Sequence, residues 1–139
     1  MKKLVKLFSE KDTAKLAEDI AHSLKKGDVI ALYGELGVGK TFFTKKLCSF
    51  LEVREIVSSP SYVLMNEYEG KFPIFHLDLY RLNATEEVLE LGIHELFEKG
   101  ILIIEWPEIA EDLLPRKTIK IKFKFENSHR IAEVEKHKE

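Results

Sequence analysis

Apolar residues recur along the chain at two spacings, and these predict alternating strands and helices. Short apolar runs, which are typical of strands, lie at residues 4–8, 28–33 and 101–104. The third run is continuous, a pattern that favours a strand covered on both faces, as in a parallel sheet. Leu16, Ile20 and Leu24 recur every fourth residue and predict a helix over residues 12–25. The same reasoning predicts a helix over residues 40–51.

Two further pairs of runs predict antiparallel hairpins. The first pair is 62–68 and 72–79, joined by Glu69-Gly70-Lys71, and the second is 117–125 and 130–136, joined by Asn127-Ser128. Between the hairpins, Asn83 precedes Glu86 by three residues, the spacing of a capping box, and predicts a helix that Gly92 interrupts. Together the elements predict an α/β fold with a mixed, partly parallel central sheet flanked by helices.

The composition narrows the class of protein. A length of 139 residues predicts one domain, comprising residues 1–139. The formal net charge of −2 argues against a nucleic-acid binder that works by bulk charge. The single cysteine, Cys48, excludes an intrachain disulfide and a cysteine-based zinc site. No apolar run approaches the roughly twenty residues that span a bilayer, and the N-terminus lacks a signal-peptide core, so we expect a cytoplasmic protein.

One stretch has the spacing of a phosphate-binding loop: glycine, four residues, glycine, lysine, threonine. It follows a predicted strand and precedes a predicted helix, which is the context that such a loop needs. The alternative is a glycine-rich turn with a chance Lys-Thr, but all the spacings and both flanking elements match. This P-loop comprises Gly34, Glu35, Leu36, Gly37, Val38, Gly39, Lys40 and Thr41.

Each part of the P-loop has a physical reason to bind a nucleotide. The glycines let successive backbone N–H groups turn inward around a phosphate. The helix that begins near Lys40 adds unpaired N–H groups and the positive end of its dipole. Lys40 would bring an ammonium to the β- and γ-phosphates, and the Thr41 hydroxyl would ligate Mg²⁺.

Two acidic residues are candidates for the rest of the site. Glu105 follows a predicted strand, and parallel strands end at one edge of a sheet, so its carboxylate would hold Mg²⁺ or orient the attacking water. The alternative is a loop glutamate that only aids solubility. Asp78 lies in an apolar run, where an unpaired carboxylate is costly, so it could complete the Mg²⁺ shell or receive a proton. The alternative is a structural pair with Arg81, with His76 as a hydrogen-bonded core residue.

Two further features have several interpretations. A loop pinned by Pro60 carries hydroxyls that could sense a γ-phosphate, as switch loops do, although loops are often rich in serine for structural reasons. Trp106 could cover the nucleotide, dock a partner or fill the core. The hydroxyl-bearing residues of the loop are Ser58, Ser59, Ser61 and Tyr62.

Five stretches together resemble one family, the bacterial TsaE (YjeE) ATPases of tRNA threonylcarbamoyladenosine biosynthesis. They occur in the family's order and at its spacing across nearly the whole chain. The P-loop alone is shared by countless NTPases, whereas the third and fifth stretches together are specific. The five are the P-loop, Ser59-Pro60-Ser61-Tyr62, His76-Leu77-Asp78-Leu79-Tyr80-Arg81, Leu91-Gly92-Ile93 and Ile104-Glu105-Trp106-Pro107-Glu108.

The resemblance implies a small P-loop ATPase that binds ATP with Mg²⁺ and acts with the partner proteins TsaD and TsaB. These partners install threonylcarbamoyl on adenosine 37 of tRNAs that read codons beginning with A. The family member is not itself the transferase, and its ATP cycle would reset or activate the partner complex. It would contact tRNA only through that complex, and no membrane is implied.

Matching positions also imply roles for single residues. Lys40 and Thr41 match the phosphate and metal residues, Glu105 the metal carboxylate, and Asp78 the acid of the second motif. Ser61 matches the hydroxyl of the switch-like loop, where the family usually has threonine. The family's usual threonine after Lys-Thr is replaced by Phe42, which carries no role. Nucleotide contacts are further implied for Thr13, near the base, and for Trp106 and Arg130.

Two other functions are compatible with the residues. A small-molecule kinase would need an acceptor pocket and a lid with arginines, for which a chain of 139 residues with four arginines leaves little room. A binding switch with negligible turnover would use ATP only to change its affinity for a partner. It differs from an ATPase in whether a variant that binds ATP without hydrolysing it still supports function.

Overall fold

The strands of the described residues pair into one seven-stranded sheet in the order β1-β7-β6-β2-β5-β4-β3. The computed structural model describes residues 1–35, 39–60 and 63–137. The strands are β1 (Lys2–Leu7), β2 (Val29–Tyr33), β3 (Met65–Glu69), β4 (Pro73–Asp78), β5 (Ile101–Glu105), β6 (Ile119–Glu126) and β7 (His129–Glu135). The helices are α1 (Glu10–Ser23), α2 (Lys40–Phe50), α3 (Thr85–Glu90), α4 (Ile93–Lys99) and the 3-10 helix η1 (Pro107–Leu113).

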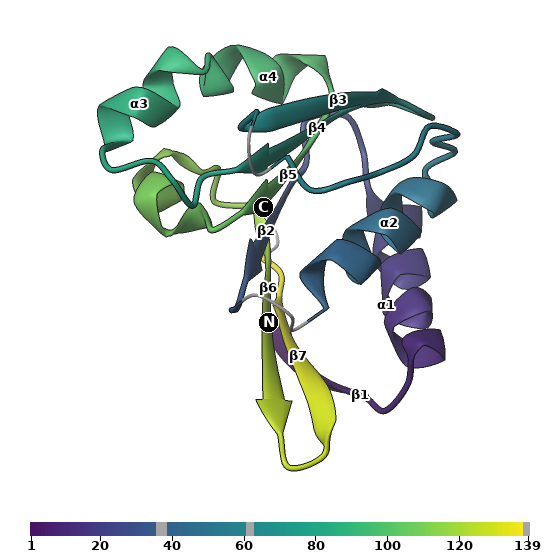
Figure 1. Cartoon of the computed structure of the whole chain (residues 1–139). Helices are drawn as coiled ribbons and strands as arrows, with labels where there is room; N and C mark the ends of the chain where they lie inside the picture. Colours follow the sequence, from purple (N-terminus) through teal and green to yellow (C-terminus); the bar gives the residue numbers. More distant parts are fainter. Residues whose placement is uncertain (36–38, 61–62, 138–139) are drawn as a thin grey trace.

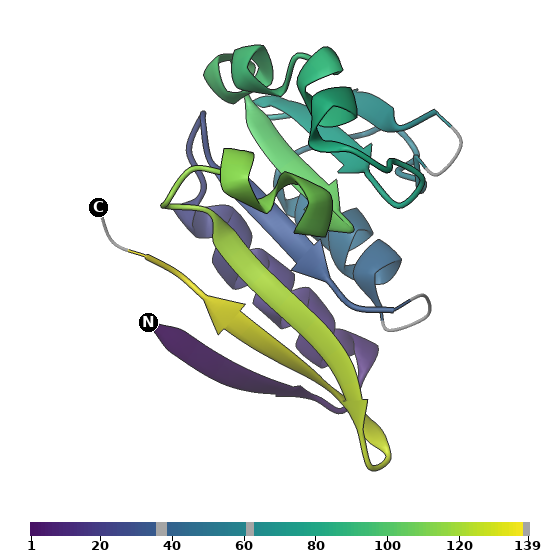
Figure 2. The same cartoon turned by 90° about the vertical axis from the view of Figure 1, so that its left-hand side faces the viewer.

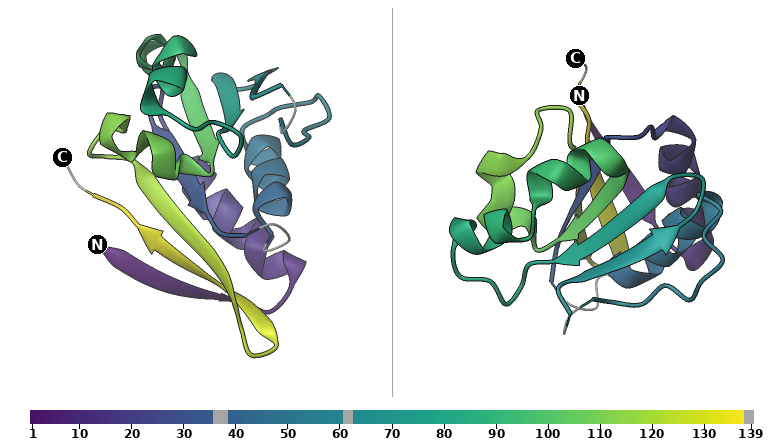
Figure 3. Two further views of the ribbon diagram at one scale, coloured as in Figure 1. Left: turned by 60° about the vertical axis from the view of Figure 1, so that its left-hand side comes forward. Right: turned by 90° about the horizontal axis from the view of Figure 1, so that it is seen from above.

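The sheet is mixed, as the pattern of apolar residues predicted. Strand β2 is parallel to both β5 and β6, and β4 is parallel to β5. The two predicted hairpins form the antiparallel pairs β3–β4 and β6–β7, and β1 adds a third antiparallel pair along β7. The prediction of an α/β fold with a mixed, partly parallel sheet flanked by helices is therefore confirmed (Figure 3).

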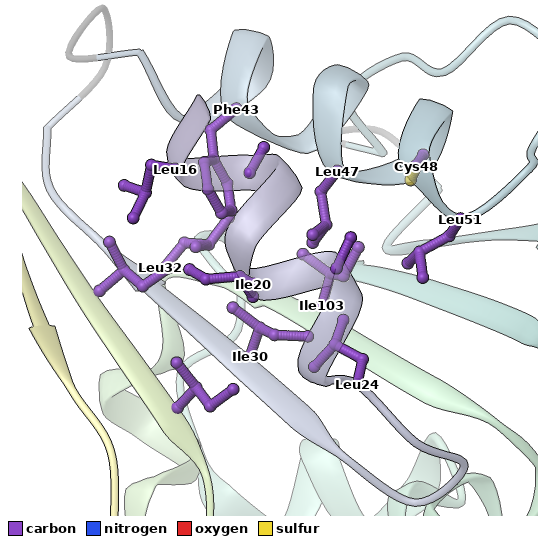
Figure 4. Packing of buried hydrophobic residues seen from close by; sticks show 14 of the residues in the cluster. Leu16, Ile20, Leu24, Ile30, Leu32, Phe43, Leu47, Cys48, Leu51 and Ile103 are labelled. Carbon is purple, nitrogen blue, oxygen red and sulfur yellow. The ribbon is translucent and has the colours of Figure 1, made fainter. Parts of the chain in front are cut away.

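Helices cover both faces of this sheet. Helices α1 and α2 lie on one face, and α3, α4 and η1 lie on the other (Figure 1). Ile30 and Ile103 pack beneath α1 and α2 (Figure 4), whereas the neighbouring Val29 and Leu102 belong to the cluster beneath α3, α4 and η1. Successive residues of β2 and β5 are thus buried in turn on opposite faces, which explains their continuous apolar runs.

Two predicted helix starts need correction. Helix α1 begins at Glu10 rather than at residue 12, and Ser9 is its N-cap residue. The Asp12 carboxylate, in the first turn, accepts a hydrogen bond from the backbone N–H of Phe8 at 2.9 Å. The predicted capping box was wrong by one residue. The Glu87 carboxylate accepts hydrogen bonds from the backbone N–H groups of Asn83 and Ala84, at 2.8 and 3.0 Å. The correct glutamate lies one position later because Ala84, not Asn83, precedes the first helical turn.

One edge of the sheet collects the ends of many strands. Strands β1, β6, β2, β5 and β4 all run in the same direction, so all five end at this edge, where β7 begins. The chain termini lie at the opposite end of the β1–β7 pair (Figure 2), where the Met1 ammonium donates a hydrogen bond to the carbonyl of Lys136 at 2.7 Å. The P-loop follows β2 directly, so this edge positions the candidate site.

Candidate functional site

The described residues of the P-loop have the backbone that the glycines were expected to allow. Gly34 and Gly39 have φ angles of +134° and +105°, which L side chains rarely adopt. Gly39 precedes the first turn of α2, so the loop ends at the N-terminus of that helix. Leu36, Gly37 and Val38, which were also predicted to bind nucleotide, lie outside the described residues.

Lys40 lies at the centre of the site. Its side chain is 4% exposed, and its ammonium donates a hydrogen bond to the carbonyl of Gly34 at 2.5 Å. Burial lowers the pKa of Lys40 from its ordinary value, and nearby carboxylates oppose that shift. Those carboxylates, Glu105, Asp78 and Glu108 in order of effect, therefore lie close enough to act on the ammonium.

Asp78 and Glu105, the acid pair, end their two strands side by side. They are the last residues of β4 and β5 and are partners in the parallel register. Both are buried, at 6% and 4% exposure. They share a face of the sheet with Ile74 and Ile103, which pack beneath α1 and α2, so their side chains lie on the same face as the P-loop helix. Because β2 and β5 are parallel, the expectation that Glu105 and the P-loop lie at the same edge of the sheet is borne out.

A buried histidine contacts the acid pair from within β4. The ring nitrogen Nε2 of His76 lies 2.6 Å from Oε2 of Glu105, and His76 is 1% exposed. The alternative of a hydrogen-bonded core histidine is therefore right, but its partner on the next strand was missed. The pair depends on the register of β4 against β5, which places His76 opposite Ile103 and so two residues from Glu105 on the same face. The Oδ1 atom of Asp78 accepts a hydrogen bond from the backbone N–H of Tyr80 at 3.0 Å.

Trp106 lies beside Lys40 rather than deep in the core. Its half-buried indole has its centroid 4.2 Å from the Lys40 ammonium, within range of a cation–π interaction. A left-handed backbone, with φ of +53°, turns Trp106 away from the direction of β5. The ring of Tyr80, which sequence reasoning did not select, packs on the indole with centroids 4.8 Å apart.

Arg130 approaches the P-loop from the other side. A Cβ atom added to Gly39 would lie 3.5 Å from Cδ of Arg130, so the two residues are neighbours. The guanidinium lies over the ring of Phe125, 5.1 Å from its centroid, across the β6–β7 hairpin. The Nε atom of Arg130 is buried and has no hydrogen-bond partner among the described residues. The structure thus brings a cation beside the end of the P-loop, where a nucleotide contact was expected.

The other predicted residues are less closely gathered. Thr41 is exposed in the first turn of α2, and Glu35 is exposed at the start of the loop. Thr13 is buried on the face of α1 that also carries Leu16 and Ala17. Its expected contact with the base stays a prediction. Ser61 and Tyr62 lie outside the described residues, whereas Ser58 is anchored through its backbone N–H, which donates to the hydroxyl of Tyr68 at 3.1 Å.

The oxygen donors at this edge fit a magnesium ion that arrives with phosphates. In the described part of the chain, no group of three or more His, Cys, Asp or Glu side chains could hold a metal by itself. Mg²⁺ is usually held by one or two carboxylates together with substrate phosphates rather than by an all-protein cage. Thr41, Glu105 and Asp78 offer one hydroxyl and two carboxylates, which fits that arrangement. No described helix is long and apolar enough to cross a membrane.

Comparisons with known proteins agree with this geometry. The family model described as "Threonylcarbamoyl adenosine biosynthesis protein TsaE" matches residues 7–133. Proteins named tRNA threonylcarbamoyladenosine biosynthesis protein TsaE are similar to the chain. That of Rickettsia conorii is 39% identical over 92% of this chain and 75% of its own length, and that of Aquifex aeolicus is 47% identical over 76% and 77%. The crystal structure of Bacillus subtilis YdiB superposes with a TM-score of 0.81 at 29% identity, covering 96% of this chain and 84% of that one.

Proposed function

The chain belongs to the TsaE family of tRNA threonylcarbamoyladenosine biosynthesis proteins, and from this premise we propose that it binds ATP with Mg²⁺ and hydrolyses it. Hydrolysis would serve the modification of adenosine 37 by a TsaD–TsaB transferase complex, in the cytoplasm. The whole chain, residues 1–139, forms the ATPase domain in this proposal. One observation supports it above the others. Lys40 begins the helix after the P-loop, and the acid pair ends two neighbouring parallel strands at the edge from which that loop leaves β2.

The proposed reaction is an in-line attack of water on the γ-phosphate of ATP. A bond forms between the water oxygen and phosphorus while the bond to the β-phosphate oxygen breaks, giving ADP and inorganic phosphate. Lys40 leaves the Gly34 carbonyl to contact the β- and γ-phosphates, and backbone N–H groups of residues 37–41 stabilise the developing charge. Glu105 or Asp78 orients the attacking water.

Three side chains would hold the metal ion. Thr41 and Glu105 would ligate Mg²⁺, with Asp78 completing the shell, and the ion supplies charge neutralisation for the phosphates when bound. The strand register supports this assignment, because it sets the two carboxylates side by side on the face of α2. Arg130, Trp106, Thr13 and Ser61 would contact the nucleotide.

Steady-state phosphate release by the purified chain tests the proposal, measured with and without the TsaD–TsaB pair. We expect slow release alone and faster release with the pair, because in this proposal hydrolysis serves the transferase complex. No release in either condition, with ATP binding intact, would favour a binding switch. Release without any effect of the pair would remove the partner assignment and leave the ATP site standing.

A further inference from the structure

His76 is the most buried of the charged or titratable side chains at this edge, yet the proposed reaction does not use it. It lies inside β4, two residues before Asp78, and is 1% exposed. Its Nε2 atom lies 2.6 Å from Oε2 of Glu105, across the boundary between two parallel strands. A contact that short between two buried polar groups of different strands fixes both side chains relative to the sheet.

The surroundings of the imidazole indicate which way this hydrogen bond runs. The other ring nitrogen, Nδ1, is buried and has no hydrogen-bond partner among the described residues. A proton on Nδ1 would leave a buried donor without an acceptor, which is more costly than a lone pair without a donor. This arrangement favours a proton on Nε2, which would be donated to the Glu105 carboxylate. The bond engages one oxygen of Glu105, and the second oxygen keeps its lone pairs for another ligand.

The two members of the acid pair are held in different ways. Asp78 has a short side chain, and the backbone N–H of Tyr80, two residues away, holds its Oδ1 atom. Glu105 has a longer side chain with three rotatable bonds, and its hydrogen bond comes from a side chain 29 residues away in the sequence. A buried glutamate without such a donor would lose part of its compensation for desolvation and its single rotamer.

We propose that His76 is a positioning residue that holds the Glu105 carboxylate toward the P-loop, in the orientation needed to ligate Mg²⁺. This role of His76 rests on the proposed function, because it requires Glu105 to be a ligand of Mg²⁺. Residues that orient a metal ligand typically affect metal affinity by 10- to 100-fold. The effect should reach the metal through Glu105 alone, with no direct contact between His76 and the nucleotide.

The test compares substitutions that keep or remove the donor at the position of Nε2. His76→Gln places an amide N–H near that position, whereas His76→Asn has an amide too short to reach Glu105. His76→Leu removes the donor altogether.

Calorimetry gives the affinity for ATP with and without Mg²⁺, and urea unfolding confirms that each variant is folded. We expect His76→Asn and His76→Leu to need about 10- to 100-fold more Mg²⁺ to reach half of the increase in ATP affinity that Mg²⁺ causes. Their affinity for metal-free ATP should be unchanged. His76→Gln should stay within about threefold of the parent.

A double-mutant cycle separates positioning from general damage. In a Glu105→Gln background, the further change His76→Asn should have no additional effect on the Mg²⁺ dependence, because the only route to the metal is already lost. Additive effects would overturn the proposal, as would equal Mg²⁺ dependence in the parent, His76→Gln and His76→Asn. If the parent itself shows no Mg²⁺-dependent binding of ATP, the proposed function fails first, and the role of His76 fails with it.

Discussion

The P-loop separates two halves of the same sheet edge, and the halves differ in chemistry. On one side, β4 and β5 end in buried carboxylates that are held by hydrogen bonds from His76 and from the backbone of Tyr80. On the other side, the β6–β7 hairpin presents Arg130, whose guanidinium lies over the exposed ring of Phe125. Lys40, the first residue of α2, lies between the two halves.

This difference predicts the direction in which a nucleotide lies. Carboxylates repel phosphate unless a metal ion intervenes, so the acid pair suits the end of the triphosphate that carries Mg²⁺. An arginine next to an aromatic ring suits the nucleoside side, where it can bond to phosphate oxygens or stack on a base. We therefore expect the γ-phosphate toward Glu105 and the nucleoside toward the hairpin.

Lys40→Ala should have the largest effect on turnover, because the Lys40 ammonium would contact the β- and γ-phosphates. Removing one preorganised charge of this kind lowers kcat by about 100- to 1,000-fold. Phosphate release from ATP is the measurement, with Lys45→Ala, an exposed lysine later on α2, as the matched control. Intact turnover in the Lys40 variant would contradict the assignment of the P-loop.

Glu105→Gln should weaken the binding of Mg²⁺ by the acid pair while leaving the fold intact. Glutamine has the same shape and can still accept a hydrogen bond from His76, but it is a much weaker ligand for Mg²⁺. We expect turnover to fall about tenfold to 100-fold with metal-free ATP binding retained. Glu98→Gln, an exposed change of the same chemistry in α4, is the control. Equal turnover in the two variants would remove Glu105 from the metal site.

Arg130→Ala should affect the other half in a different way. A hydrogen bond to a charged group contributes about 1.5–3 kcal/mol, so the KM for ATP should rise about tenfold or more. The kcat should change little, because Arg130 would contact a part of the nucleotide that does not react. ADP should lose affinity by a similar factor. A fall in kcat without a change in KM would instead place Arg130 near the γ-phosphate.

Phe125→Leu should give the smallest effect and test how the hairpin holds its arginine. Leucine keeps an apolar contact but removes the aromatic face, and an exposed cation–π pair contributes about 0.5–1 kcal/mol. The affinity for ATP should therefore fall about two- to fivefold, and Phe125→Tyr should restore it. Phe8→Leu is the control, because Phe8 is also an exposed ring but packs on His129, with ring centroids 4.6 Å apart, rather than on Arg130. Equal losses at the two positions would indicate a general effect on this edge.

Much of the fold could be predicted from the sequence because its signals are local. The P-loop spacing, the continuous runs of β2 and β5 and the hairpin turns each depend on residues that are close in the chain. A continuous apolar run favours a strand in a parallel sheet, so the meeting of Glu105 with the P-loop could be expected before the register was known.

The missed parts depend on geometry that no local pattern contains. The contact of His76 with Glu105 needs the offset between two strands, and the position of Trp106 depends on a left-handed residue directly after β5. The approach of Arg130 to Gly39 requires the hairpin to lie beside the start of α2. Before the structure was known, only the resemblance to a family had indicated that arginine.

A crystal structure of the chain with Mn²⁺ and a non-hydrolysable ATP analogue gives the most direct test of the nucleotide's direction across the P-loop. We predict a metal ion bonded to the Thr41 hydroxyl and the Glu105 carboxylate, with the γ-phosphate on the acidic side and the nucleoside beside Arg130. A triphosphate that runs the opposite way, or a metal ion bound without either carboxylate of the acid pair, would contradict the proposed site.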